Sequence, residues 1–199
     1  MPGETRALGP VTPARQARAG LTLLEVLTVI VLLGIVAAIG LPRIDFAGAK
    51  ANAAARALAL ALSRAQREAV TLQSDVWVAV DSAGRALVVH EDRNNDGLVQ
   101  PGERVTTVAL DEGVVFGTSG APPLPMGAGT VSFTRTHNGL PAIVFHRDGS
   151  ANESGGFYLT TVKHLAAGKP TGTRAVTVTQ ATGRPLWWSY GSGTWVSAR

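Results

Sequence analysis

The sequence predicts an α+β protein in which a long N-terminal helix packs on an antiparallel, β-sandwich-like head. Three observations predict this fold class. An uncharged apolar stretch covers residues 26–41, and an alanine-rich stretch without glycine or proline covers residues 50–73. After Ser74 the sequence changes to short β-branched runs separated by turn signals. We therefore expect a helix with a membrane-spanning first half and an amphipathic second half, followed by a β-rich head.

The composition narrows the class of protein. Of the 199 residues, 45% are hydrophobic and 16% are charged, which excludes disorder driven by low hydrophobicity and high charge. The chain has no cysteine, so disulfide scaffolds, thiolate metal sites and cysteine nucleophiles are excluded. The formal net charge of +4 indicates nucleic-acid binding only if the charges gather on one surface.

The first half of the helix is expected at residues 21–41. About 21 residues make roughly 31 Å of helix, which is enough to cross the hydrocarbon core of a membrane. Residues 1–20 carry three arginines against one glutamate, and a basic flank before an apolar span places the N-terminus in the cytoplasm. A buried core helix fits less well, because the uncharged run is long. A signal peptide cut at residues 47–49 also fits less well, because Arg43 and Asp45 precede that site.

Glu25 interrupts the apolar segment near its start. A carboxylate in a membrane span costs about 2.5–3.5 kcal/mol on insertion scales, so it should have a partner and a function. Gly20 stands five residues earlier, and the run that follows it reads Leu-Thr-Leu-Leu-Glu. A basic leader, a glycine, a hydrophobic residue and a glutamate at the fifth place closely resemble the class III signal of type IV pilins and type II secretion pseudopilins.

The resemblance implies a processing site. A prepilin peptidase would cleave between Gly20 and Leu21 and N-methylate the new terminus at Leu21, where most family members have phenylalanine. Residues 1–20 would then be a cytoplasmic leader that is removed, and residues 21–41 would remain as a transmembrane helix. Glu25 would serve assembly by pairing with the terminal amine of a neighbouring subunit, which fixes the axial register of the helices.

The second half of the helix and the head follow at residues 42–74 and 75–199. Pro42 matches the place where the membrane half of such helices often ends. One apolar helix stripe is expected to contain Leu58, Leu62, Ala65, Ala69 and Leu72. Seven strands are expected at residues 76–80, 85–90, 105–110, 131–134, 142–146, 157–162 and 175–179.

Features of the head resemble the minor pseudopilin H family of the type II secretion system. They are an acidic Asn/Gly loop, a phenylalanine-rich stretch at residues 133–149 and a Thr-Gly-Arg turn at residues 182–184. The resemblance implies a structural, non-enzymatic subunit near the tip of a periplasmic pseudopilus that drives folded proteins across the outer membrane. Its partners would be the prepilin peptidase, other pseudopilins and the inner-membrane assembly platform. The chain would be a single-pass inner-membrane protein with a cytoplasmic N-terminus and a periplasmic head.

Two other functions stay open at this point. A minor type IV pilin in pilus assembly, adhesion or DNA uptake would carry the same N-terminal signal. Nucleic acid is not an expected partner, because Arg184 has no second arginine beside it and removal of residues 1–20 lowers the net charge from +4 to +2. An anchored or secreted enzyme has no catalytic sequence motif to support it.

An acidic segment of the head fits the pattern of a twelve-residue calcium loop. Asp92, Asn94 and Asp96 alternate before Gly97, and Glu103 ends the pattern. Oxygens at alternate positions can converge on one hard cation, so calcium is one hypothesis. The other is a polar hairpin loop without a cofactor, because calcium loops of that kind join helices and this one joins predicted strands.

The remaining chemistry-bearing residues predict no site. The four histidines, at positions 90, 137, 146 and 164, lack metal-ligand spacing and are expected at strand ends or on the surface. Three tryptophans and a tyrosine gather near the C-terminus and form either a docking surface or the closing strand of the head: Trp187, Trp188, Tyr190 and Trp195.

Overall fold

The structure is a computed structural model that describes residues 20–40 and 46–198. The chain divides into two units, Met1–Ile44 and Asp45–Arg199. Residues 1–19 of the predicted leader, Pro42 and the end of the predicted membrane span lie outside the described residues.

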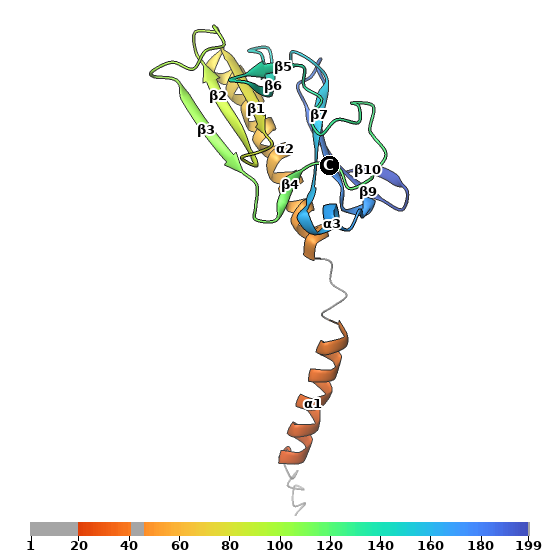
Figure 1. The fold of residues 1–199 in the computed structure, drawn as a ribbon. Coiled ribbons are helices and arrows are strands. Elements are labelled where there is room, and N and C mark those ends of the chain that lie inside the picture. Colours follow the sequence, from red (N-terminus) through yellow and green to blue (C-terminus); the bar gives the residue numbers. More distant parts are fainter. Residues whose placement is uncertain (1–19, 41–45, 199) are drawn as a thin grey trace, which may run out of the picture. The chain divides into compact units, whose positions relative to one another are not determined.

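The first unit contains helix α1, Leu23–Gly40 (Figure 1). Its run of leucine, isoleucine and valine carries one charged residue, Glu25, in the first turn. Large apolar side chains are exposed along it, from Leu23 to Val36. Within the part of the chain that the structure describes, no helix combines the length and the apolarity that a membrane crossing needs.

The second unit begins with helix α2, Phe46–Leu72. The prediction of a helix over residues 50–73 is confirmed, and the helix starts four residues earlier. Leu72 of the predicted stripe is 37% exposed, because it stands in the last turn, where the helix ends. Eight residues of α2 are buried, and most of them are alanines that allow the sheets to approach closely: Ala51, Ala54, Ala55, Leu58, Ala59, Leu62, Ala65 and Ala69.

Among the described residues, ten strands form two five-stranded sheets, and every pair of neighbours is antiparallel. The first, sheet A, has the order β3-β2-β1-β6-β5. Its strands are β1 Asp75–Asp81, β2 Ala86–Asp92, β3 Arg104–Ala109, β5 Arg135–His137 and β6 Leu140–Phe145.

The second, sheet B, has the order β10-β9-β8-β7-β4. A short helix α3, Val162–Ala166, and a 3-10 turn at Pro170–Gly172 connect two of its strands. The strands are β4 Val114–Phe116, β7 Gly155–Thr161, β8 Arg174–Val178, β9 Pro185–Gly191 and β10 Thr194–Ala198.

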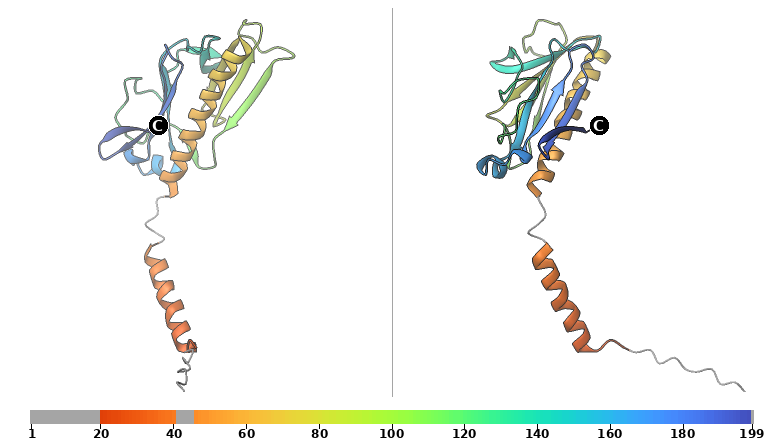
Figure 2. Two further views of the ribbon diagram at one scale, coloured as in Figure 1. Left: turned by 180° about the vertical axis from the view of Figure 1, so that it is seen from behind. Right: turned by 90° about the vertical axis from the view of Figure 1, so that its right-hand side faces the viewer.

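The hydrophobic core lies between α2 and the two sheets (Figure 2). Strand residues that alternate along the chain face the helix, as the pleat of a strand requires. Sheet A contributes Val76, Val78, Val80, Leu87, Val89, Ile143 and Phe145. Sheet B contributes Val114, Phe116, Phe157, Leu159, Val176, Val178 and Trp187.

Six of the seven predicted strands are confirmed and one is wrong. Residues 131–134 form no strand: Val131 makes an isolated bridge with Phe157, and Phe133 is buried in the core as part of a loop. The apolar residues there are explained by burial and not by pairing. The seven predicted ranges do not include β4 and β5, which have three residues each, or β9 and β10, the first of which starts with a proline.

Candidate functional site

The predicted processing segment lies directly before α1. Gly20 and Leu21 are exposed and not helical, and a Cβ added to Gly20 would meet nothing within 4 Å. The Thr22 hydroxyl accepts a hydrogen bond from the backbone N–H of Glu25 at 3.2 Å. Thr22 therefore caps the helix, and the Thr-x-x-Glu spacing is that of a capping box. The bond between Gly20 and Leu21 thus lies in an exposed, non-helical segment directly before the helix cap.

Glu25 stands on the first turn of α1 with its side chain exposed. Carboxylates are stabilised near helix N-termini because the first N–H groups of the helix carry partial positive charge. The position leaves the carboxylate free to meet a cationic group of another molecule. It lies four residues from Leu21, the predicted new N-terminus.

The acidic loop that follows β2 is closed by its own hydrogen bonds. Asp92 Oδ2 accepts from the Gly97 N–H at 2.7 Å and from Trp77 Nε1 at 3.1 Å. Asp92 Oδ1 accepts from the Asp96 N–H at 3.1 Å. Asp96 in turn accepts from the Leu98 N–H at 2.8 Å and from two side-chain amides, those of Asn94 and Gln100. The carboxylate oxygens of both aspartates are therefore occupied by donors of the protein.

The side chain of Glu103 forms hydrogen bonds outside the Asp92–Asp96 cluster. Its Oε2 lies 2.9 Å from His90 Nε2 and accepts from the Gln100 N–H, and its Oε1 accepts from the Arg93 N–H. The hydrogen bond to His90 is the main cause that lowers the pKa of Glu103 below its usual value. The two N–H donors from Gln100 and Arg93 lower this pKa further.

The structure thus brings the four predicted calcium ligands into one loop, but each has other partners. Among the described residues, no three His, Asp or Glu side chains are grouped so that they could hold a metal ion. The arrangement has the hydrogen bonds of a polar hairpin loop. Calcium binding itself stays an untested hypothesis.

Three aromatic rings stack on the face of sheet A that points away from α2. The ring of His137 lies between those of Trp77 and His90, with 4.9 Å between centroids on each side. His90 is 0% and His137 is 3% exposed. Burial lowers the pKa of His137, and the nearby His90 lowers it further, while Asp92 and a hydrogen bond to Gly97 oppose the shift.

The expectation for the histidines is therefore wrong at two positions. His90 is buried in the middle of β2, and His164 is buried in α3, so neither lies at a strand end or on the surface. His137 ends β5 and His146 directly follows β6, as expected. His90 is buried because β5 brings His137 over it, a contact that spacing in the sequence does not reveal.

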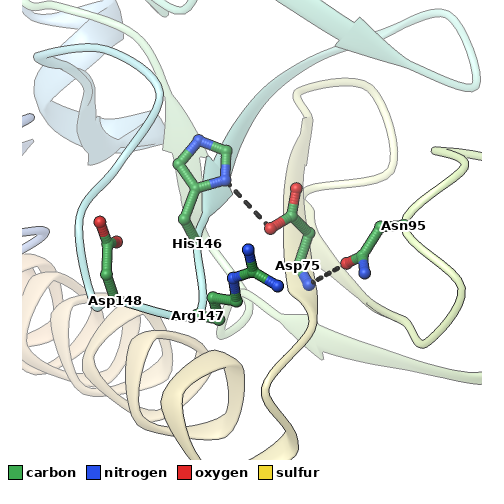
Figure 3. A pocket seen from close by; sticks show the side chains of 5 residues that line it. All are labelled: Asp75, Asn95, His146, Arg147 and Asp148. Carbon is green, nitrogen blue, oxygen red and sulfur yellow. Dashed lines mark hydrogen bonds and ion pairs between the residues drawn. The ribbon is translucent and has the colours of Figure 1, made fainter.

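A pocket of about 400 Å³ lies where β1 begins and β6 ends (Figure 3). His146 points toward Asp75, and its Nδ1 lies 3.0 Å from Asp75 Oδ1. Asn95 reaches the same strand end, where its amide oxygen accepts from the Asp75 N–H at 2.7 Å. Arg147 and Asp148 complete the described lining of the pocket.

Gln66 of α2 joins two turns that are distant in sequence. Its Nε2 donates to the carbonyl oxygen of Gly149 at 2.7 Å and to that of Thr182 at 2.6 Å. Gly183 is buried with φ +58, and a Cβ added there would lie 2.2 Å from the Gly149 oxygen. The Thr-Gly-Arg turn is thus a contact between the helix and sheet B.

The C-terminal aromatic residues close sheet B. They lie on the β9–β10 hairpin, where Trp187 is buried and Trp188 Nε1 donates to Thr177 Oγ1 at 2.9 Å. Trp195 Nε1 donates to the Pro122 carbonyl at 2.8 Å. The interpretation as closing strands is confirmed, although two strands are present where one was expected.

A family comparison covers most of the chain. Residues 54–183 match the family described as Type II transport protein GspH. The chain belongs to this family. Residues 15–41 match the prokaryotic N-terminal methylation motif, which includes the positions of Gly20, Leu21 and Glu25.

No curated protein matches the sequence of this GspH-family chain. The chain resembles the solved structure of the minor pseudopilin EpsH from the Type 2 Secretion System of Vibrio cholerae, with 15% sequence identity and a TM-score of 0.44. The match covers 75% of this chain and 96% of that one.

The GspH family confirms the prediction of a type II secretion minor pseudopilin, and it does not favour the type IV pilin alternative. The family match begins in α2 and ends at Gly183, so it contains the Gln66 contact. Sequence reasoning missed Gln66, because nothing in a single helix sequence indicates a partner 116 residues away. It also missed Thr22, although the Thr-x-x-Glu spacing could have indicated the cap.

Proposed function

We propose that this GspH-family chain is made as an inner-membrane precursor, which a prepilin peptidase cleaves between Gly20 and Leu21 and then N-methylates on Leu21. Residues 1–20 are the cytoplasmic leader, and residues 21–41 are the single membrane span. The mature chain is a structural, non-enzymatic subunit of the periplasmic pseudopilus near its tip. Through that filament it takes part in the export of folded proteins across the outer membrane.

The observation that carries the proposal is the order Gly20, Leu21, Glu25 inside a methylation motif, on a chain whose head is of the GspH family. Exposure of the Gly20–Leu21 bond supports it, because a peptidase must bind the bond in an extended conformation. The Thr22 cap supports it further. The cap starts the helix directly after the cleavage site, so the new α-amine lies on a short non-helical end of the chain.

The proposed role of Glu25 follows from charge. A carboxylate in an apolar environment is stabilised when it pairs with a cation, and cleavage creates one at Leu21. Pairing between neighbouring subunits fixes the axial register of the helices in a filament. The same carboxylate also suits the first turn of α1 before assembly.

The proposed partners are the prepilin peptidase, other pseudopilins and the inner-membrane assembly platform. The methylation motif implies the first two classes, and the platform is required to build a filament from membrane-anchored subunits. Nucleic acid is not proposed as a partner, because the mature chain has a net charge of only +2 after loss of the leader. No cofactor is required for a structural role.

The test is a secretion measurement in the bacterium that carries the gene. Deletion of the gene is expected to leave folded substrates of type II secretion in the periplasm, and the wild-type gene should restore their export. The variant Gly20→Val should not restore export, because a branched side chain replaces the glycine at the cut.

A matched control is Gly34→Ala, which changes a glycine of the same segment where an added Cβ meets nothing within 4 Å. It should restore export as the wild type does. Normal export in the deletion strain, combined with loss of surface pili, would instead assign the chain to a type IV pilus.

A further inference from the structure

Strand β3 forms an open edge of sheet A. It pairs with β2 on one side, and no strand of the described residues pairs with its other side. Five of its six residues are exposed, and Val108 is half-buried. Among the four described edge strands it is the longest, since β4 and β5 have three residues and β10 has five. An exposed edge with unpaired N–H and C=O groups is a template for a further strand.

A groove runs between β3 and α2. The helix packs against β1 and β2, and β3 stands beyond it, as the rear view in Figure 2 shows. Apolar side chains of Ala61, Val89 and Val108 line a hollow of about 50 Å³. A second hollow of about 360 Å³ adjoins the first, because Arg64 and Arg104 line both. The groove therefore has an apolar part and a polar part side by side.

The charged residues that line the groove are mostly arginines. Arg64, Arg67, Arg93 and Arg104 line it, against two glutamates. The side chains of Arg64, Arg93 and Arg104 are 64%, 60% and 57% exposed. Each guanidinium has five N–H donors, so many of these donors face solvent.

The two glutamates of the groove pair with only part of the guanidinium donors. Glu91 is 7% exposed and is shared by Arg93 at 3.6 Å and Arg104 at 3.5 Å, both long for an ion pair. Glu68 lies 2.9 Å from Arg64 Nε. The groove therefore keeps an excess of positive charge beside an open strand edge.

We propose that this groove binds an extended, acidic segment of a partner protein, which adds to β3 as a further strand of sheet A. Backbone N–H and C=O groups of the segment would pair with the free edge, as in other cases of strand addition. Arg104, Thr106 and Val108 alternate toward the groove, so carboxylates at every second position of the segment would face the arginines. A nucleic acid would satisfy the arginines but not the strand edge. The proposal goes beyond the proposed function, since it depends on neither processing nor Glu25.

The test uses the full chain in detergent micelles and a short labelled peptide of alternating glutamate and valine. Fluorescence anisotropy should show saturable binding that weakens as salt is added. The double variant Arg64→Gln/Arg104→Gln should bind about tenfold or more weakly, because it loses two guanidinium partners of the peptide. Both side chains are more than half exposed, so the fold should survive, as circular dichroism would verify.

Controls separate charge from strand addition. Arg135→Gln, which changes an exposed arginine on the opposite edge of the same sheet, should leave binding unchanged. A peptide N-methylated at alternate backbone amides should bind about tenfold more weakly, because it cannot pair with a strand edge.

Four results would overturn the proposal. The first is equal binding of a peptide with lysine in place of glutamate. The second is full binding of the N-methylated peptide, and the third is full binding of the unmodified peptide to the double variant. The fourth is tighter binding of a DNA duplex that is lost in the same double variant, which would replace the polypeptide partner by a nucleic acid.

Discussion

The side-chain amide of Gln66 donates a hydrogen bond to the carbonyl oxygen of Thr182 at 2.6 Å, across 116 residues of sequence. A second bond from the same nitrogen reaches Gly149. Together they connect the C-terminal third of α2 to the β6–β7 turn and to the turn before β9. The family match ends at Gly183, beside this contact.

Gly183→Ala is expected to destabilise the head. Its φ of +58 disfavours any Cβ, and the added atom would lie 2.2 Å from the Gly149 oxygen and 2.8 Å from Gln66 Nε2. We expect a loss of about 2–3 kcal/mol, seen as a Tm lower by several degrees. Gly193→Ala is the matched control, because Gly193 has φ +81 but no atom within 4 Å of an added Cβ. Equal losses in the two variants would contradict the expectation that the close approach of Gly149 and Gln66 adds to the backbone strain at Gly183.

Mild acid is expected to destabilise the head through His137. Burial holds the pKa of this imidazole below its usual value of 6.5, so below pH 6.5 the unfolded chain binds a proton that the folded chain does not. The contribution of the neutral His137 to the free energy of unfolding is complete above pH 6.5 and is lost as the pH falls from 6.5 toward the lowered pKa. The slope is at most about 1.4 kcal/mol per pH unit.

The variant His137→Phe isolates this effect. It keeps a ring between Trp77 and His90 but has no proton to bind. Denaturant unfolding between pH 7.5 and 5.5 should show a smaller loss of stability in the variant than in the wild type. An unchanged dependence of stability on pH in the variant would contradict the role of His137.

Glu103 acts in a lower pH range. Its lowered pKa stabilises the folded chain above pH 4.5, the usual pKa value, and this stabilisation is lost as the pH falls below 4.5.

Calcium is expected to leave the Tm of the chain unchanged. The oxygens of Asp92 and Glu103 already accept hydrogen bonds from the protein, so a cation would have to displace them. Scanning calorimetry with millimolar calcium, compared with chelator at matched ionic strength, measures this. A Tm that rises with calcium concentration would establish the calcium loop instead, since binding to the native state stabilises it by mass action.

Glu25→Ala is expected to leave processing and membrane insertion intact but to impair assembly with other pseudopilins. The variant removes a carboxylate and leaves the Thr22 hydroxyl to cap α1. Membrane fractionation and co-isolation of other pseudopilins measure the two steps separately. Glu25→Asp keeps the charge and should retain part of the assembly. Normal secretion by Glu25→Ala would refute the pairing role.

Local patterns predicted the elements whose signal lies within a few residues. The alanine stripe of α2 and the branched runs of β1, β2 and β7 were predicted because burial repeats at helix or strand spacing. The stack of His137 on His90 was not, since it depends on how β5 folds over the sheet. The groove beside β3 was also beyond the sequence, because its arginines come from α2, β3 and the loop after β2.

The mass and N-terminal sequence of the mature chain, isolated from the inner membrane of the native bacterium, test the central claim most directly. We expect a mature chain that begins at Leu21, carries one methyl group on its α-amine and retains residues 21–41. A mature chain that begins at Lys50, or one that still contains residues 1–20, would contradict it.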